Sequence, residues 1–390
     1  MTFENQYDTE TKKKFGVFYT PEDTSEFMAE KTKKFDDGVG IWLDPCCGLG
    51  VLSIKLASIQ DNPISFIQNR LIINEKDKKQ LDIALANFKE IFGVVPKSFN
   101  EDFLTFDFDV DYVIMNPPYF KYMESDIYAL FIEKVCKISR GFISINPISF
   151  TNGVNFNNTR KEILNYSSIT TYHFDNIPGQ IFKDANVRVT ILMAHNNSNE
   201  RKTTSLVRWK SIERKKMFTN LEKRLGDGTF TEKNFFKTNI DISKYNKSKE
   251  TLKDYMVLNS DYPLYVTNSV RYFITASTER LDREGQIKIF MKDFDSYKKT
   301  LVLLNSSYLY WWWRTVDSSL SLTKRTLLSL PWINIDIDEN IIDEIKNSEQ
   351  INKVYKKNAG KLQENIKHPK TLVKKLNSIF LTEDFIELHN

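Results

Sequence analysis

The sequence has few cysteines and no long apolar run. Its 390 residues include only three cysteines, Cys46, Cys47 and Cys136, and two are adjacent, which excludes a disulfide framework and a four-cysteine zinc site. No apolar run approaches the roughly 18 residues needed to span a bilayer, and the first residues lack the pattern of a secretory signal. The four histidines show no spacing typical of metal ligands. We therefore expect a cytoplasmic protein with reduced thiols, no metal site and no membrane contact.

The composition that is present, 41% hydrophobic and 27% charged, is typical of a globular protein. A chain of this length exceeds what one hydrophobic core usually serves, so we expect two domains. The net charge of +4 conceals an asymmetry. Residues 1–200 carry 21 basic and 27 acidic side chains (21 − 27 = −6), whereas residues 201–390 carry 34 and 24 (34 − 24 = +10). This asymmetry indicates a catalytic half and a half that meets a polyanion, although lysine-rich runs can also be solvated helix faces.

The first half alternates short apolar runs with helical patterns. Strands are expected at residues 40–43, 71–74, 110–115, 141–146 and 187–194, and helices at 51–59, 76–92 and 127–138. This alternation predicts an α/β fold with a mostly parallel sheet and helices on both faces. The polar run at 196–200 predicts a linker, which places the domains at residues 1–195 and 196–390. The C-terminal part shows helical spacing in Ile341, Ile342 and Ile345, in Ile351, Val354 and Tyr355, and in Leu372, Val373, Leu376, Ile379 and Phe380.

Three motifs follow the predicted strands and suit a nucleoside. The first is the turn Asp44-Pro45-Cys46-Cys47-Gly48-Leu49-Gly50, whose glycines allow close approach to a ligand at the start of a helix. The second is Glu75, which can accept hydrogen bonds from both ribose hydroxyls. The third is Asp102-Phe103, which can bind an adenine amine and stack on the ring. Each alone could be a surface acid or a core phenylalanine, but their order favours a site.

Asn116-Pro117-Pro118-Tyr119 ends the strand expected at 110–115, because prolines cannot continue a sheet ladder. The side-chain carbonyl of Asn116 and the main-chain carbonyl of Pro117 can both accept hydrogen bonds from one exocyclic amine. They would draw its lone pair out of conjugation with the base. Tyr119 offers a flat face for an extruded base. The alternative is a plain Asn-Pro turn, although this tetrapeptide after a buried strand is much less common.

Together these motifs resemble the gamma-class (TaqI-like) N6-adenine DNA methyltransferases of restriction-modification systems, in that class's order and over most of the chain. The resemblance implies a class I S-adenosylmethionine-dependent methyltransferase fold, followed by a mixed α/β target-recognition domain. It implies that S-adenosyl-L-methionine is bound by Phe18, Tyr19, Thr20, Asp44, Cys46, Gly48, Gly50, Glu75, Lys76, Asp102, Phe103, Asn116 and Pro118. It also implies that the catalytic residues are Asn116, Pro117, Pro118, Tyr119 and Phe182, with Phe182 packing the other face of a flipped adenine.

In the second half, residues 301–331 resemble the target-recognition module of the same enzymes. Candidate DNA contacts are Arg314, Lys324, Arg325, Arg208 and Lys210, because arginine and lysine make most phosphate and base contacts. The run Trp311-Trp312-Trp313 is interpreted as core rather than a stacking platform. The resemblance therefore predicts methylation of adenine N6 in a short double-stranded DNA sequence. Such modification would protect DNA from a companion restriction endonuclease that acts separately.

Other interpretations share parts of this pattern. An RNA adenine-N6 methyltransferase would carry the same cofactor motifs. A protein-glutamine methyltransferase also uses Asn-Pro-Pro-Tyr, because a glutamine amide presents the same amine, and cytosine N4 is a further acceptor of that kind. A non-catalytic DNA-binding specificity subunit would keep the fold without the chemistry, which the intact tetrapeptide and Glu75 argue against.

Overall fold

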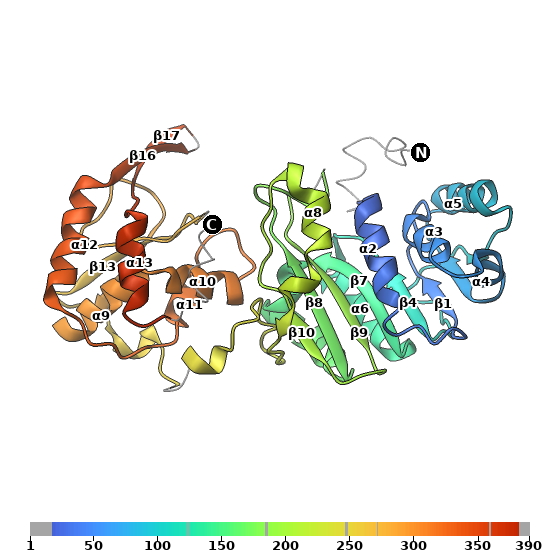
Figure 1. Ribbon diagram of the computed structural model, residues 1–390, viewed down its shortest axis with the longest axis horizontal. Helices are drawn as coiled ribbons and strands as arrows, with labels where there is room; N and C mark the ends of the chain where they lie inside the picture. The colour runs from blue at the N-terminus through green and yellow to red at the C-terminus, as the bar shows by residue number, and fades with distance from the viewer. Residues whose placement is uncertain are drawn as a thin grey trace. The chain divides into compact units, whose positions relative to one another are not determined.

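The computed structural model describes residues 18–122, 125–183, 186–245, 249–270, 272–358 and 360–381. The chain forms two compact units, Met1–Asn239 and Ile240–Asn390 (Figure 1). The boundary predicted at residues 195–196 is wrong, because it falls inside the first unit, whose sheet continues through β10 (Arg201–Thr203) and β11 (Gly226–Asp227). In the described part of the chain, no helix is long and apolar enough to cross a membrane.

The sheet of the first unit has the order β11-β10-β8-β9-β7-β4-β1-β2-β3. Its other strands are β1 (Trp42–Asp44), β2 (Leu71–Asn74), β3 (Lys97–Phe99), β4 (Tyr112–Met115), β7 (Gly141–Pro147), β8 (Ser168–Phe174) and β9 (Val189–His195). β9 is antiparallel to β7 and β8, and β11 is antiparallel to β10, while the remaining neighbours are parallel. This confirms the predicted fold class. The strand order reverses beside β1, and open α/β sheets bind ligands at such a point.

Helices cover both faces of this sheet, as adjacent residues of one strand demonstrate. Trp42 belongs to a hydrophobic cluster with residues of α3 and α5, whereas Leu43 belongs to a second cluster with residues of α6 and α7. Successive strand side chains point to opposite faces, so each face has its own core. The helices are α2 (Glu22–Thr32), α3 (Val51–Ser58), α4 (Pro63–Asn69), α5 (Lys78–Phe92), α6 (Ile127–Ile138), α7 (Asn157–Ile163) and α8 (Arg214–Thr219), and a short hairpin joins β5 (Lys121–Tyr122) to β6 (Ser125–Asp126).

The strands and helices predicted in the first half correspond to β1, β2, β4, β7, β9, α3, α5 and α6, with small shifts of their ends. β8 was not predicted, because the threonines and His173 interrupt its apolar pattern. In the structure the ring nitrogens of His173 lie 2.8 Å from Oγ1 of Thr190 and 3.1 Å from Oγ1 of Thr203. These neighbouring strands therefore satisfy a polar side chain that is fully buried.

The second unit contains the antiparallel sheet β12-β15-β13-β14 and a separate hairpin of β16 and β17. Its strands are β12 (Met256–Val257), β13 (Pro263–Thr267), β14 (Ala276–Ser277), β15 (Gln286–Met291), β16 (Lys353–Asn358) and β17 (Lys361–Ile366). Its helices are α9 (Phe294–Asn305), α10 (Ser307–Val316), α11 (Lys324–Leu328), α12 (Glu339–Ile351) and α13 (Lys370–Ser378). The three tryptophans of α10 are buried, as predicted.

The helical C-terminal part is only partly confirmed. α12 and α13 form where expected, but Val354 and Tyr355 lie in β16, which pairs with β17 through a turn at Gly360. Ile351, Val354 and Tyr355 fit the spacing of one helix face, but β-branched and aromatic residues also favour strands. Residues 382–390 of the predicted tail lie outside the described residues.

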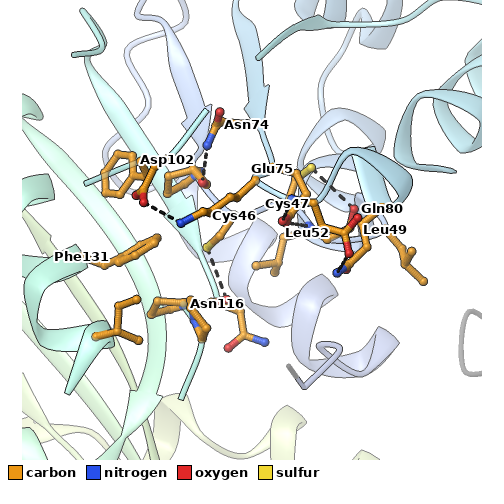
Figure 2. A pocket seen from close by; sticks show the side chains of 18 of the residues that line it. Cys46, Cys47, Leu49, Leu52, Asn74, Glu75, Gln80, Asp102, Asn116 and Phe131 are labelled. Atoms are coloured by element: carbon orange, nitrogen blue, oxygen red, sulfur yellow. Dashed lines mark hydrogen bonds and ion pairs between the residues drawn. The ribbon is translucent and has the colours of Figure 1, made fainter. Parts of the chain in front are cut away.

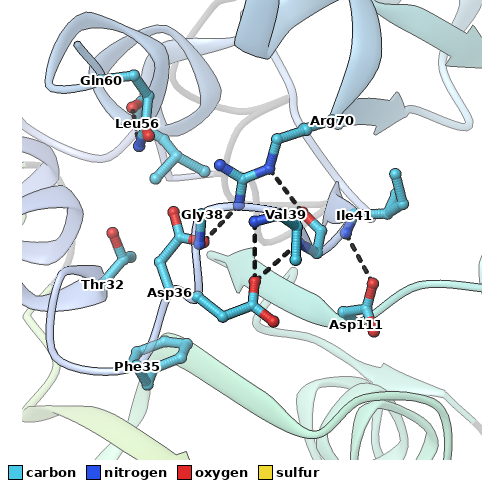
Figure 3. A network of polar contacts seen from close by, with 12 residues as sticks. Thr32, Phe35, Asp36, Gly38, Val39, Ile41, Leu56, Gln60, Arg70 and Asp111 are labelled. Atoms are coloured by element: carbon cyan, nitrogen blue, oxygen red, sulfur yellow. Dashed lines mark hydrogen bonds and ion pairs between the residues drawn. The ribbon is translucent and has the colours of Figure 1, made fainter.

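A polar network fixes the chain where it enters β1 (Figure 3). The guanidinium of Arg70 binds the carboxylate of Asp36, and its Nε donates a hydrogen bond to the carbonyl of Gly40 at 3.0 Å. The carboxylate of Asp111 accepts a hydrogen bond from the N–H of Ile41 at 2.8 Å. The network lies at the amino end of β1 and leaves the carboxyl end, where the glycine turn begins, free for a site.

We expect Arg70→Ala to lower the free energy of unfolding by about 2 kcal/mol, because the largely buried Asp36 carboxylate loses its partner. Arg70→Lys should recover part of this loss, since it keeps the charge but not both contacts. Urea denaturation of the three proteins measures both effects. A free energy of unfolding for Arg70→Ala equal to that of the unsubstituted protein would contradict this role.

Candidate active site

A cavity of about 650 Å³ lies at the carboxyl ends of β1, β2, β3 and β4 (Figure 2). The glycine turn, the end of β2, the loop after β3 and the tetrapeptide after β4 all contribute to its wall. The predicted residues that line it are Phe18, Tyr19, Thr20, Cys46, Gly48, Glu75, Lys76, Asp102, Phe103, Asn116, Pro117 and Pro118. Asp44, Gly50, Tyr119 and Phe182 do not line it. The structure thus brings most of the predicted cofactor residues to one cavity.

Asp44 and Gly50 support the glycine turn on the side away from the cavity. Asp44 is 1% exposed, and its carboxylate accepts hydrogen bonds from the hydroxyl of Ser53 at 2.5 Å and the N–H of Cys46 at 3.4 Å. Burial raises the pKa of Asp44 to about 7. Gly50 has φ +84° where α3 begins, a conformation that favours glycine. Both residues therefore brace the turn against the following helix.

Glu75 joins the glycine turn to the start of α5. One carboxylate oxygen accepts the N–H of Gly48 and the other accepts the N–H of Asp77, both at 2.9 Å. Burial raises the pKa of Glu75. Each carboxylate oxygen has a further lone pair that can accept a hydrogen bond from a ligand hydroxyl.

Asn74 was not among the predicted site residues, yet it connects the end of β2 to two of the loops around the cavity, those after β1 and β3. Its side-chain NH2 donates to the carbonyls of Pro45 at 3.0 Å and Glu101 at 3.1 Å, and its side-chain oxygen accepts the N–H of Glu101 at 3.1 Å. Its main-chain carbonyl accepts the N–H of Cys47 at 2.9 Å. The available signal was a polar residue at the end of a buried strand, directly before Glu75.

Asp102 lies on the side of the cavity opposite Gln80 in Figure 2, and Phe103 also lines the cavity. Lys76 donates to the Asp102 carboxylate at 2.8 Å, and this hydrogen bond lowers the pKa of Asp102. Phe103 is only 2% exposed and packs on Phe131, with ring centroids 4.8 Å apart. Most of the Phe103 ring therefore belongs to the core, and Phe131 contributes to the same wall.

The Asn116 side chain has a fixed orientation and one unpaired acceptor. Its NH2 donates to the carbonyl of Phe18 at 2.6 Å and to Oγ1 of Thr20 at 3.1 Å. Because a carbonyl can only accept, this contact places the amide oxygen on the other side. That oxygen is buried and has no hydrogen-bond partner among the described residues. An unpaired buried acceptor costs about 1–3 kcal/mol, which a donor from a ligand can offset.

Gln80 has the same property and was not predicted. It lies in the first turn of α5 and is 6% exposed, and its NH2 lies 3.4 Å from the Asp77 carboxylate. Its side-chain oxygen has no partner among the described residues and would lie 3.5 Å from a Cβ added at Gly48. Nothing in the sequence distinguishes Gln80 from an ordinary polar helix residue.

Tyr119 and Phe182 lie together, but not as parallel faces. Their ring centroids are 5.9 Å apart and their planes meet at 79°, and Phe18 contacts both rings. The hydroxyl of Tyr119 donates to the carbonyl of Ile145 at 2.9 Å. A base stacked between Tyr119 and Phe182 would need parallel rings that are further apart, so this pair would have to reorient.

The predicted DNA contacts divide into two groups. Arg208 donates to the Asp175 carboxylate at 2.8 and 3.0 Å, and Arg314 is 7% exposed, with its guanidinium 5.6 Å from the ring centroid of Tyr310. Each of these arginines is therefore held by its own unit. The other candidates, Lys210, Lys324 and Arg325, are exposed.

Residues 2–135 match the profile of a protein family described as N-6 DNA Methylase. No curated protein matches the chain. The methyltransferase subunit of a type I restriction-modification system from Streptococcus thermophilus is similar over 54% of each chain, with 18% identity and a TM-score of 0.42. The DrdV protein in a DrdV–DNA complex is similar over 54% of this chain and 30% of its own, with 18% identity and a TM-score of 0.47. The chain thus spans about half, or less, of these structures.

Two glycines with left-handed backbones test the role of the turn. A Cβ at Gly50 would meet the Cβ of Ala84 at 3.3 Å, whereas a Cβ at Gly93 (φ +75°) would meet nothing within 4 Å. We expect Gly93→Ala to cost about 1–2 kcal/mol of stability from backbone strain alone. Gly50→Ala should cost more, and should also weaken binding of the expected cofactor, because Ala84 would displace the turn.

Urea denaturation measures the stability of both variants, and calorimetry measures binding of S-adenosylmethionine. Equal stability losses, with unchanged affinity in both variants, would show that the position of Gly50 against α5 is unimportant.

Proposed function

We propose that the chain is a site-specific DNA methyltransferase that transfers a methyl group from S-adenosylmethionine to N6 of an adenine in double-stranded DNA. The proposal depends above all on the side-chain oxygen of Asn116, which is buried, fixed in orientation and unpaired beside the cavity. The oxygen fits an exocyclic amine, which can donate a hydrogen bond. The family match at residues 2–135 supports the proposal, because it includes the glycine turn, Glu75 and Asn116.

The residues around the cavity fit S-adenosylmethionine. The Glu75 carboxylate would accept the ribose hydroxyls, and Asp102 would accept the adenine amine beside Phe103 and Phe131. The unpaired oxygen of Gln80, close to Gly48, would accept a ribose hydroxyl or the cofactor's ammonium group. A cavity of about 650 Å³ is within the range of pockets that bind ligands of this size.

The bound cofactor supplies an electrophilic methyl group. The carbonyl oxygens of Asn116 and Pro117 would accept hydrogen bonds from the two N–H groups of the adenine amine, which keeps the nitrogen lone pair available to attack the methyl carbon. The bond between that carbon and the sulfonium sulfur would break as the new N–C bond forms, and the methylated amine would then lose one proton to solvent. Cys46 supports this position, because its thiol lies 3.4 Å from the main-chain carbonyl of Asn116. Burial raises the pKa of Cys46 well above the usual range, so it remains a neutral thiol and not a nucleophile. Catalysis would then arise mainly from positioning and from fixed dipoles.

The adenine must leave the DNA stack to reach Asn116, at a cost of a few kcal/mol. Tyr119, Phe18 and Phe182 form the aromatic group beside the tetrapeptide. We propose that Tyr119 and Phe182 turn their faces to the extruded base when DNA binds. The aromatic contact would offset part of the cost of unstacking.

In a cell, this activity would modify DNA in the cytoplasm and protect it from a companion restriction endonuclease that acts separately at the same sequence. An RNA adenine-N6 methyltransferase would use the same cavity and is the second candidate. A non-catalytic DNA-binding specificity subunit would have no need for the unpaired oxygens of Asn116 and Gln80.

Methylation of random-sequence duplex DNA, followed by modification-sensitive sequencing, tests the proposal directly. We expect N6-methyladenine within one short sequence. A parallel reaction with ribosomal RNA distinguishes the second candidate. Methyl transfer to RNA alone, to cytosine N4, or to neither nucleic acid would overturn the proposal.

Asn116→Ala should lower the rate of methyl transfer by about 100-fold or more, because the amine loses a fixed acceptor. Binding of S-adenosylmethionine should change only a few-fold. Asn69→Ala is the matched control, since it removes an asparagine amide that is bound to the carbonyl of Ser65 and does not line the cavity. Single-turnover kinetics and calorimetry separate the two effects. Cofactor binding lost together with transfer in Asn116→Ala would count against the catalytic role.

Gln80→Leu should weaken S-adenosylmethionine binding by about tenfold, yet leave the ligand-free protein as stable or more stable. This combination is expected because the substitution removes an acceptor that is unpaired until the ligand binds. Gln60→Leu is a control at a glutamine whose NH2 is bound to the carbonyl of Leu56. Calorimetry and urea denaturation provide the two measurements. Unchanged affinity in Gln80→Leu would exclude a ligand contact there.

A further inference from the structure

The hairpin of β16 and β17 is a basic two-stranded ribbon in the second unit. Its strands and turn contain Lys353, Lys356, Lys357 and Lys361 against a single acid, Glu364. Figure 1 shows the hairpin extending from the helices and the four-stranded sheet of its unit. All four lysines are exposed. The hairpin therefore presents positive charge to the solvent on a thin, projecting element.

The base of the hairpin is anchored in the unit. Ile366 is buried, and its carbonyl accepts a hydrogen bond from the Thr275 hydroxyl at 3.0 Å. The carboxylate of Glu364 accepts the N–H of Asp282 at 2.8 Å, and the main-chain N–H of Glu364 donates to the carbonyl of Asp282 at 2.9 Å. These contacts hold the end of β17. Nearer the turn, the printed contacts to the rest of the unit are made by long, exposed lysine side chains: Lys361 pairs with Glu284, and Nζ of Lys356 lies 6.0 Å from the ring centroid of Phe273.

Lys356 and Lys357 are the least neutralised lysines of the hairpin. Lys353 pairs with Glu364 at 3.0 Å, and Lys361 pairs with Glu284 at 2.6 Å in an exposed contact. Lys356 and Lys357 have no ion pair within the described ranges. Because successive strand residues point to opposite faces, these two ammonium groups lie on the two faces of the ribbon.

Apolar side chains accompany these charges. Tyr355 is 58% exposed and Leu362 is 65% exposed. Tyr355 lies on the same face as Lys357, and Leu362 is directly opposite Lys357 in the register. Lysines alone are a common means to prevent pairing at sheet edges. That explanation does not require an exposed tyrosine and leucine beside them, whereas a binding surface does.

We propose that this hairpin enters a groove of duplex DNA, with Lys356 and Lys357 on the phosphates and Tyr355 against sugars or base edges. This inference rests on the proposed function, because it assigns the element that contacts the DNA. A two-stranded ribbon fits the major groove, which is about 12 Å wide. Six-residue strands extend about 20 Å, so the ribbon reaches beyond the depth of the groove. Lysines on both faces can approach the phosphate rows on both sides.

The test uses the full chain and compares two double substitutions. Lys356→Gln with Lys357→Gln removes the two unpaired charges of the hairpin. Lys346→Gln with Lys374→Gln removes two exposed charges from α12 and α13 of the same unit. DNA affinity is measured by fluorescence anisotropy at several salt concentrations, with a duplex and with an RNA of the same sequence. Calorimetry with S-adenosylmethionine checks that the first unit is unaffected.

We expect the hairpin variant to reduce the slope of log affinity against log salt concentration by about 2, since each phosphate contact contributes about 0.9. The control variant should retain the slope, and both should bind the cofactor normally. An unchanged slope in the hairpin variant overturns the inference even if the protein methylates DNA. A stronger effect on RNA than on the duplex overturns the choice of DNA. If the unsubstituted protein binds no DNA, the proposed function and this inference both fail.

Discussion

The buried amide of Asn74 is the contact on which the candidate site depends. Its side-chain NH2 donates hydrogen bonds to the carbonyls of Pro45 and Glu101, and its side-chain oxygen accepts one from the N–H of Glu101. Its main-chain carbonyl accepts a hydrogen bond from the N–H of Cys47. An asparagine can donate and accept at once, so one side chain unites loops that follow β1 and β3. The positions of Glu75 and Asp102 relative to the glycine turn follow from this connection.

The polar groups at the two ends of β1 differ in their hydrogen bonding. At the amino end, Arg70 pairs with Asp36 and donates to the carbonyl of Gly40, and Asp111 accepts the N–H of Ile41. These contacts stabilise the fold. At the carboxyl end, Gln80 and Asn116 each keep one buried oxygen without a partner among the described residues. Such atoms cost about 1–3 kcal/mol each. Beside the cavity, such an oxygen can accept a hydrogen bond from a ligand, which would offset this cost.

The sequence predicted the lining of the cavity best where a lining residue directly follows a buried strand. The glycine turn, Glu75 and Asn116 all satisfy that condition. Contacts between residues that are far apart in the sequence could not be predicted. Examples are the hydrogen bond between Asn74 and Glu101 and the position of the Gln80 side chain beside Gly48. The domain boundary was missed because β10 and β11 have only three and two residues and carry little pattern. The β16–β17 hairpin was not predicted, because its few apolar residues fit the spacing of a helix face as well as that of a strand.

The charge distribution predicts that the second half meets a polyanion, and arginine and lysine of that half behave differently in the structure. The guanidinium of Arg208 is bound by Asp175, and that of Arg314 lies inside its own unit. The planar guanidinium of arginine is weakly hydrated and often binds carboxylates or stacks on rings within the protein. The ammonium group of lysine is strongly hydrated and usually remains in solvent. The exposed positive surface of the second unit is mainly lysine, which binds phosphate as a point charge. Among the predicted contacts, exposed Arg325 retains the chemistry for bidentate recognition of a base. Affinity and sequence choice would then reside in different elements of that unit.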